Sequence, residues 1–365
     1  MATSNDFASN NLVGKNIDGW NVLRQVVPST TPGGTGGVHS ICYIVERDGV
    51  QYFMKVLDLF YIFQGKGSLA EKMQKASNEF QYEKKISKYC DNNNVTKVIR
   101  YVADGATQIE DFLLGEVEYI VFESAKCNIR DYLNFSAGLD LVAKVKTLSE
   151  KLESLRNVAV GLKQLHSAKV THQDLKPSNI VSCHDGDTKI CDLGSALCFD
   201  AEYKDNTRKV VTFNGDANYA PPEAIFGALV KCGQEEFYQM DNYTLGGIIA
   251  FYITGLSFNA LMNKHLPLRM NYMAENIDMN ESKDYLINAY QDALEDIRSM
   301  IPLVTVRDGL VNIVAYLCNP YPEKRGHPKN LTPGTRVSNY DLVRTVSELD
   351  LLRRKAEIEL IRWHQ

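Results

Sequence analysis

The chain has 365 residues, of which 44% are apolar and 23% are charged, the balance of a folded protein with a substantial core rather than a disordered one. This length suits two domains or one large bilobal unit. Lys and Arg number 40 against 45 Asp and Glu, and the net charge of −5 excludes strong electrostatic attraction to nucleic acid or to an anionic membrane. We therefore expect neither as a partner.

The cysteines and the N-terminus favour a reducing compartment. None of the eight cysteines forms a C-x-x-C pair, so scattered reduced thiols fit better than a disulfide framework or a zinc site. Residues 1–10 have neither a basic start nor an apolar run, and we expect no secretory signal. The stretch 243–255 is too short and too interrupted by Thr and Gly to span a bilayer. These features predict a cytoplasmic protein.

The first part of the chain predicts strands. Residues 1–16 are rich in Asn and Ser, and we expect them to fray. Residues 41–45 and 50–57 are rich in β-branched and aromatic side chains and predict two strands. Asp48-Gly49 between them is a strong turn signal, so the pair is expected to form a hairpin.

A glycine-rich segment lies before this hairpin, and a helix and a strand follow it. Four of the five residues 33–37 are glycine, a composition that folds only as a loop. Residues 71–89 have helical composition, and 117–122 is apolar at almost every position, which predicts a buried strand.

Beyond residue 125 the pattern becomes mostly helical. Apolar residues recur at helical spacing within 155–165, 306–317 and 342–352. Two short strand candidates, 178–181 and 188–191, interrupt this pattern. Strands with one helix first and mostly helices afterwards predict an α+β fold.

The most informative segment is 170–181, where polar side chains gather between apolar ends. Asp192-Leu193-Gly194 begins thirteen residues after Asn179, the last polar residue of this segment. Carboxylate and amide oxygens from separate loops are what Mg²⁺ needs beside phosphates, and a nearby carboxylate and ammonium can orient an attacking hydroxyl. A glycine-rich loop lets backbone N–H groups approach phosphate closely. Four polar side chains of the segment 170–181 lie within eight residues: His172, Asp174, Lys176 and Asn179.

These motifs resemble those of the eukaryotic-type protein kinase superfamily, over roughly residues 17–330. His172 to Asn179 is similar to the catalytic loop, and Asp192 to Gly194 is similar to the metal-binding D-F-G. A lone H-x-D often occurs by chance, whereas an ordered set of motifs does not. The later members of the set are Pro221-Pro222-Glu223, Asp241 to Gly246 and Asn319 to Arg325.

The resemblance implies a bilobal protein-kinase-like fold, with a small β-rich N-lobe that carries one main helix and a larger, mostly helical C-lobe. We expect four segments along the chain: a flexible N-terminus over 1–16, the N-lobe over 17–123, the C-lobe over 124–340 and a C-terminal helix over 341–365.

The resemblance also implies the roles of the catalytic-loop residues. Asp174 is expected to accept the proton of the substrate hydroxyl, and Lys176 to neutralise charge on the γ-phosphate, as in Ser/Thr-directed kinases. Asn179 and Asp192 are expected to hold Mg²⁺, for which Mn²⁺ can substitute. Alone, Asp174 suits a capping role better, but its five-residue spacing to Asn179 favours the catalytic role.

Lys55 alternates with apolar residues on the second hairpin strand. The resemblance makes it the lysine on the α- and β-phosphates of ATP, and a snorkelling surface lysine is the alternative. Its catalytic partner is expected to be a glutamate of the following helix. Glu83 is favoured because Ile86 and Tyr89 follow it in apolar register, and Glu79 is the rival.

The remaining ATP contacts implied by the resemblance come from backbone groups. Glu123 and Ala125, in the hinge between the lobes, are expected to pair with adenine. Gly34, Gly36 and Gly37 are expected to cover the phosphates. Two registers of this loop stay open: one places Thr35, Gly37 and Ser40 at the family's three glycine positions, and the other keeps Gly34 and Gly36.

Two departures from the family pattern affect the functional prediction. Gln173 replaces the arginine that receives a phosphorylated activation loop, and a neutral amide cannot form that charge-assisted pair. We therefore predict that activity does not require phosphorylation at Thr207 or Thr212. Asp216 stands where Ser/Thr kinases usually carry threonine. Its carboxylate is expected to accept a hydrogen bond from Lys176 and to repel the carboxylate of Asp174.

Three functions remain to be compared. The first is a Ser/Thr protein kinase that transfers the γ-phosphoryl of MgATP to a protein substrate. The second is a pseudokinase that binds nucleotide or a partner without turnover, and the third is a small-molecule kinase. Every charged catalytic position is retained, which favours the first over the second. The motifs at 221–223 and 241–246 favour a protein substrate over a small one.

Overall fold

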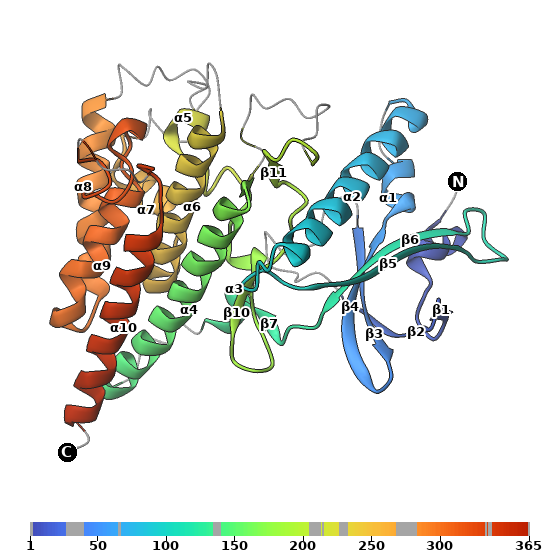
Figure 1. Ribbon diagram of the computed structural model, residues 1–365, viewed down its shortest axis with the longest axis horizontal. Helices are drawn as coiled ribbons and strands as arrows, with labels where there is room; N and C mark the ends of the chain where they lie inside the picture. Colours follow the sequence, from blue (N-terminus) through green and yellow to red (C-terminus); the bar gives the residue numbers. More distant parts are fainter. Residues whose placement is uncertain are drawn as a thin grey trace.

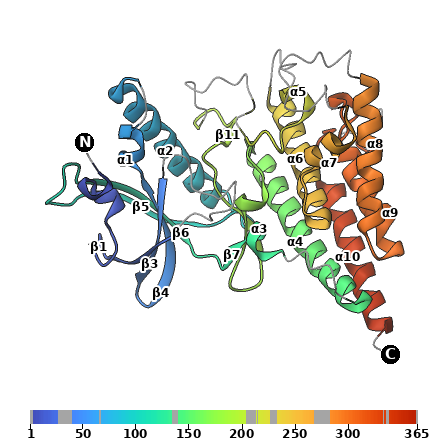
Figure 2. The same ribbon diagram turned by 180° about the vertical axis from the view of Figure 1, so that it is seen from behind.

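The structure confirms the α+β bilobal prediction. A β-rich lobe lies beside a larger helical lobe (Figure 1 and Figure 2). The N-lobe holds most of the first 123 residues, and the C-lobe holds the helices that follow. The computed structural model describes residues 3–26, 40–64, 67–133, 140–203, 213, 215–225, 233–267, 283–332, 334 and 338–363.

A six-stranded antiparallel sheet forms the N-lobe, in the order β1-β2-β3-β4-β6-β5. The predicted hairpin is β3–β4, and Asp48 and Gly49 have φ of 55° and 75°, as a tight two-residue turn requires. Within this hairpin Cys42 lies opposite Lys55. The strands are β1 Asn16–Ile17, β2 Trp20–Val26, β3 Ser40–Arg47, β4 Val50–Leu57, β5 Tyr101–Gln108 and β6 Glu116–Glu123.

Helix α2, Leu69–Asn92, packs on one face of this sheet (Figure 1). It extends the predicted helix over 71–89 at both ends. Its start is set by the Ser68 side chain, which caps the first turn by accepting from the backbone N–H of Glu71. Phe80 of α2 shares an apolar cluster with Ile120 and Phe122 of β6. This packing sets the position of α2 relative to the central strands.

The expectation that the N-terminus frays is wrong for residues 3–16. Phe7 is fully buried, and its ring lies 5.3 Å from that of Phe60 and 5.7 Å from that of Phe63. Both partners belong to α1, Leu59–Gln64, a short helix that precedes α2. The Asn- and Ser-rich composition did not indicate this order, because a few apolar residues hold the segment: Ala8 and Leu12 are fully buried like Phe7.

The C-lobe contains the three predicted helical stripes, in α4, α9 and α10. The strand candidates at 178–181 and 188–191 become β9 and β10, although Ser178 lies in a short 3-10 turn, Pro177–Asn179. The helices are α3 Ile129–Tyr132, α4 Leu141–Ser167, α5 Pro222–Ile225, α6 Gln234–Thr254, α7 Phe258–His265, α8 Lys283–Met300, α9 Val304–Leu317 and α10 Val343–Trp363. The strands are β7 Cys127–Asn128, β8 Val170–Thr171, β9 Ile180–Ser182, β10 Thr188–Ile190 and β11 Leu197–Cys198.

Helix α6 runs through the centre of the C-lobe, and α10 lies along α4 (Figure 1 and Figure 2). Most residues of α6 are buried, including polar ones such as Asp241 and Thr244. In the described ranges no single helix is long and apolar enough to cross a membrane, and α6 with α7 meets that test only as a pair bent by 78°. The buried centre of α6 therefore gives its polar side chains fixed positions from which they can hold neighbouring loops.

Candidate active site

The loop after β8 is held by a buried carboxylate of α6. Asp241, which is fully buried, accepts the backbone N–H of His172 at 2.8 Å and that of Gln173 at 2.9 Å. The ring of His166, at the end of α4, lies 3.0 Å from the same carboxylate. Three contacts from two segments thus fix the start of this loop.

The carboxylate of Asp174 has three hydrogen-bond donors around it. Its Oδ2 lies 2.8 Å from Lys176 Nζ and accepts from Asn179 Nδ2 at 3.1 Å. Its Oδ1 accepts the backbone N–H of Asp216 at 2.9 Å. The Asp174 side chain is 14% exposed, so an oriented carboxylate remains open to a reactant.

Asp216 differs from the sequence-based expectation. Its carboxylate accepts the backbone N–H and the side-chain amide of Asn218, each at 2.9 Å, and so caps the turn that follows. The expected repulsion of Asp174 is replaced by a hydrogen bond from the Asp216 backbone. The residue type at position 216 could not predict where its carboxylate points, because the direction of a short side chain depends on the conformation of the backbone around it.

Asp192 and Asn179 are brought together by the backbone between them. The N–H of Cys191 donates to the backbone oxygen of Asn179 at 2.9 Å, and the Cys191 oxygen lies 3.1 Å from His172 Nε2. Asp192 has a left-handed φ of 64°, a conformation that Asp tolerates better than most residues. His172 thus has a structural role, because its ring contacts the backbone oxygen of the residue before Asp192.

Lys55 links the two lobes. Its ammonium lies 2.8 Å from both carboxylate oxygens of Glu83 on α2 and 3.2 Å from Asp192. Glu79, the rival partner, lies on the surface 3.9 Å from Lys75. The structure therefore brings together Lys55, Glu83 and Asp192.

Charge pairing controls the protonation of these groups. Burial disfavours the charged form of Lys55, but Asp192 and Glu83 outweigh burial and hold the pKa of its ammonium above its ordinary value. The Lys55 charge likewise holds the pKa of Asp192 low despite burial. The stabilisation from ionised Asp192 is present above its ordinary pKa of about 3.9 and is lost as the pH falls through the lowered value.

Two thiols border the same groups. Burial raises the pKa of Cys42, opposite Lys55 in the sheet, to about 12. Burial also raises the pKa of Cys191, which precedes Asp192. Both are therefore neutral at physiological pH, and the seven cysteines of the described ranges are all free thiols.

The donors at this site fit a hard cation that is only partly held by protein. Asn179 Nδ2 donates to the backbone oxygen and to Oδ2 of Asp174, which turns its amide oxygen away from both. Within the described ranges no three His, Cys, Asp or Glu side chains converge as a complete metal site. Mg²⁺, which prefers a few protein oxygens together with phosphates and water, suits Asn179 and Asp192.

The predicted hinge lies where β6 leaves the sheet (Figure 1). The Glu123 carboxylate lies 2.6 Å from Lys189 Nζ and accepts the Arg100 N–H at 2.7 Å, so its side chain has a structural role. Ala125 follows in the β6–β7 connection. Their backbone contacts to adenine stay a prediction, and Gly34, Gly36 and Gly37 lie outside the described residues.

One residue of the site was missed by sequence reasoning. A Cβ on Gly215 would lie 2.1 Å from the backbone oxygen of Gln173, which is closer than a side chain allows. Glycine at this position therefore lets the segment before Asp216 reach the catalytic loop. The glycine itself was the available signal, since it directly precedes a motif residue.

Replacement of Gln173 by Met is expected to raise the free energy of unfolding by about 1–3 kcal/mol. The Gln173 side chain is buried, and within the described residues neither its Oε1 nor its Nε2 has a hydrogen-bond partner. Met has a similar length and removes the unpaired amide. Urea denaturation gives the comparison, with Gln173→Glu as the control that should destabilise. A Gln173→Met variant less stable than wild type would contradict this account.

The bilobal fold and the groups that meet between its lobes are those of the protein-kinase class of proteins. The family described as protein kinase domain matches residues 42–332, which is well over half of the chain. The chain therefore belongs to the protein kinase family.

Individual kinases are similar to this chain over only part of its length and over about a third or less of their own length. The chain is 34% identical over 131 residues to a mitogen-activated protein kinase kinase of Nicotiana tabacum, SIPKK, covering 35% of this chain and 34% of that protein. It is 29% identical over 161 residues to the Saccharomyces cerevisiae serine/threonine-protein kinase HAL4/SAT4, covering 42% and 25%. The Caenorhabditis elegans serine/threonine-protein kinase par-4 is 29% identical over 160 residues, covering 43% and 24%.

Proposed function

We propose that the protein is an active Ser/Thr protein kinase that transfers the γ-phosphoryl of MgATP to a protein hydroxyl. The observation that carries this proposal is the Asp174 carboxylate, oriented by three donors. It belongs to the same inter-lobe site as the ion pairs of Lys55 with Glu83 and Asp192.

Each residue has a definite task in this reaction. Asp174 accepts the proton of the attacking hydroxyl, and the adjacent Lys176 ammonium stabilises negative charge that develops nearby. Lys55, held by Glu83, offers a fixed positive charge to the α- and β-phosphates. When bound, MgATP supplies the phosphoryl group, and its cation takes oxygens of Asn179 and Asp192.

Lys176 supports Ser/Thr specificity, because it follows the catalytic aspartate by two residues as in Ser/Thr-directed kinases. The yeast and nematode relatives also carry Ser/Thr kinase names. Asp216 in place of the usual threonine does not contradict this. Its backbone N–H contacts Asp174, so the activation segment still touches the base.

A transfer assay tests the function. Purified protein is incubated with labelled ATP, Mg²⁺ and casein or myelin basic protein, and acid hydrolysis identifies the labelled amino acid. Label on serine or threonine supports the proposal, and Mn²⁺ is expected to substitute for Mg²⁺. Nucleotide binding without transfer indicates a pseudokinase. Transfer only to choline or an aminoglycoside, added in parallel, indicates a small-molecule kinase.

Activity is expected to persist, within about threefold, when Thr207 and Thr212 are both changed to Ala. The physical reason is that Gln173 lacks the charge needed to pair with a phosphate, so a phosphorylated loop gains little here. Both threonines lie outside the described residues. Initial rates with casein, measured before and after phosphatase treatment, provide the test. Loss of activity in the double variant would overturn the prediction.

We also propose a cytoplasmic location, with no nucleic-acid or membrane partner. The net charge of −5 and the free thiols of the described cysteines support this. Fluorescence microscopy of the tagged chain tests it, and accumulation at a membrane or in the nucleus would contradict it.

A further inference from the structure

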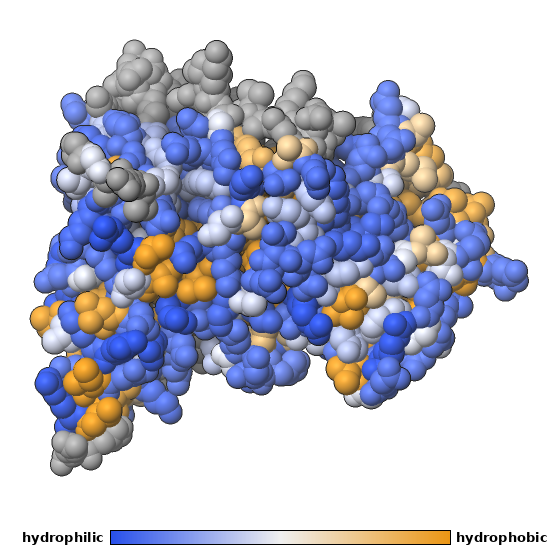
Figure 3. Space-filling view, in the orientation of Figure 1, coloured by the Kyte–Doolittle hydropathy of each residue, from blue (hydrophilic) through white to orange (hydrophobic). Residues whose placement is uncertain are grey.

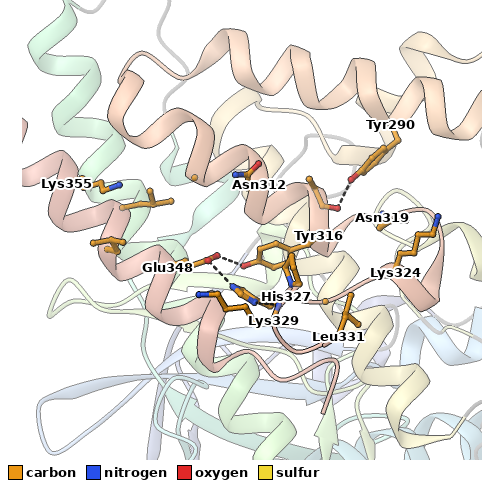
Figure 4. Close-up of a pocket in the computed structure, with 16 residues that line it drawn as sticks. Tyr290, Asn312, Tyr316, Asn319, Lys324, His327, Lys329, Leu331, Glu348 and Lys355 are labelled. Carbon is orange, nitrogen blue, oxygen red and sulfur yellow. Dashed lines mark hydrogen bonds and ion pairs between the residues drawn. The ribbon is translucent and has the colours of Figure 1, made fainter. Parts of the chain in front are cut away.

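A hollow in the C-lobe shares no lining residue with the active site. It is a cavity of about 610 Å³ between α9, α10 and the segment 324–331 (Figure 4). A volume of this size lies in the range that holds ligands or inserted side chains, about 300–1,000 Å³. We call it the C-lobe groove.

The floor of the groove is small and apolar. Leu331, Pro328 and Leu352 line it, and a Cβ on Gly309 would lie 2.7 Å from Leu352 Cδ2, so glycine allows α9 and α10 to approach closely. Leu351 at its edge is 53% exposed. An exposed leucine beside a hollow adds apolar surface that a binding partner can remove from water.

The apolar surface continues along α10 beyond the groove. Ile358 is 49% exposed and Ile361 is 59% exposed, at spacings of seven and ten residues from Leu351 that place all three near one side of the helix. Figure 3 shows apolar patches toward this end of α10 on a largely polar face. The groove and this side of α10 thus form one extended surface.

The single acidic side chain that lines the groove is already engaged. Glu348 accepts from the Tyr316 hydroxyl at 2.9 Å, and its other oxygen lies 2.9 Å from His327 Nε2. Figure 4 shows these three side chains meeting at the middle of the groove. The Glu348 side chain is 43% exposed, so the groove also presents one carboxylate at its middle.

Three exposed lysines border the groove, and within the described residues none of them forms an ion pair. Lys324 lies over the Tyr321 ring at 4.9 Å, a cation–π contact that leaves its ammonium without a carboxylate partner among the described residues. Lys355 lies at one end, Lys324 at the other and Lys329 between them (Figure 4). Three lysines against the one carboxylate of Glu348 give the residues that line this groove a net positive charge, in a chain whose net charge is −5. Charges spread along a length match a linear anion better than a compact one.

We propose that the C-lobe groove docks a linear peptide segment of a partner protein, in which leucine-like side chains alternate with Asp or Glu. The apolar side chains bind the floor at Leu331 and Leu352, and the carboxylates pair with the lysines on the rim. Complementary charge then supplies specificity and fast association, and apolar burial supplies the affinity.

The probe is a fluorescein-labelled peptide of about twelve residues with leucines separated by aspartates, and binding is followed by fluorescence anisotropy. Lys329→Glu with Lys355→Glu is expected to weaken binding at least about tenfold. The matched control, Lys144→Glu with Lys146→Glu on α4, makes the same change in net charge outside the groove and is expected to alter binding by less than about twofold.

A second pair of variants tests the apolar contact. Leu351→Asp is expected to weaken binding about fivefold, whereas Val304→Asp, at a residue that is 67% exposed and outside the groove, is not. All of these side chains are exposed, and thermal melting of each variant verifies folding. The measurement needs no phosphoryl transfer, so its outcome is separate from the proposed kinase activity.

Two results would overturn the proposal. One is equal binding by the two lysine double variants, which would mean that only net charge matters. The other is binding of the wild type to phosphatidylserine vesicles with none to the acidic peptide, which would indicate a lipid surface as the partner.

Discussion

Replacement of Asp174 by Asn is expected to slow phosphoryl transfer by about 10²–10⁴-fold, the usual contribution of a general base. The variant keeps the size of the side chain but cannot accept the substrate proton. Lys176, Asn179 and the Asp216 N–H all donate toward this carboxylate, so the wild-type base is held in one orientation. Nucleotide binding depends mainly on other residues and is expected to persist.

Single-turnover transfer to casein, with nucleotide affinity measured separately, tests this effect. The matched control is Asp216→Asn, the same chemical change on the neighbouring residue. Its backbone N–H to Asp174 is retained and its side-chain oxygen can still cap Asn218, so the rate is expected to fall by less than about tenfold. Equal losses in the two variants would contradict the assignment of Asp174 as the base.

Replacement of Glu223 by Gln is expected to lower the free energy of unfolding by about 3–5 kcal/mol, because it leaves a buried charge without its partner. Arg325 is fully buried, with Nη1 2.6 Å and Nη2 3.0 Å from the two oxygens of Glu223. Burial disfavours the charged guanidinium, but Glu223 holds the pKa of Arg325 above its ordinary value. An arginine cannot escape this cost by losing its proton.

Urea denaturation of Glu223→Gln, Arg325→Met and the double variant measures the effect. The double variant is expected to be more stable than the sum of the single losses implies, because it removes both charges. The control is Glu79→Gln, the same chemical change, which breaks the exposed pair with Lys75 and is expected to cost less than about 1 kcal/mol. A cost for Glu223→Gln as small as this would mean that the buried pair does not stabilise the fold.

Turn residues and apolar periodicity predicted the secondary structure correctly where the conformation depends on residues that are close in the sequence. Asp48-Gly49 produced the β3–β4 hairpin because both residues tolerate positive φ. The apolar periodicity of 155–165 and 306–317 appeared as the buried sides of α4 and α9. Asn and Ser composition failed at residues 3–16, because the burial of Phe7 depends on aromatic rings of α1, more than fifty residues further along the chain.

The order and spacing of its motifs alone placed this chain in the protein kinase family and selected Lys55, Asp174, Asn179 and Asp192. The functional groups of these residues, an ammonium, an amide and two carboxylates, follow directly from the residue types in the sequence.

Tertiary structure alone decided which side chains meet. It turned the carboxylate of Asp216 toward Asn218 and placed Lys355 of α10 on the same groove as Lys324 and Lys329. Such contacts depend on how helices and loops distant in sequence pack against one another, and no local pattern of residues encodes that packing.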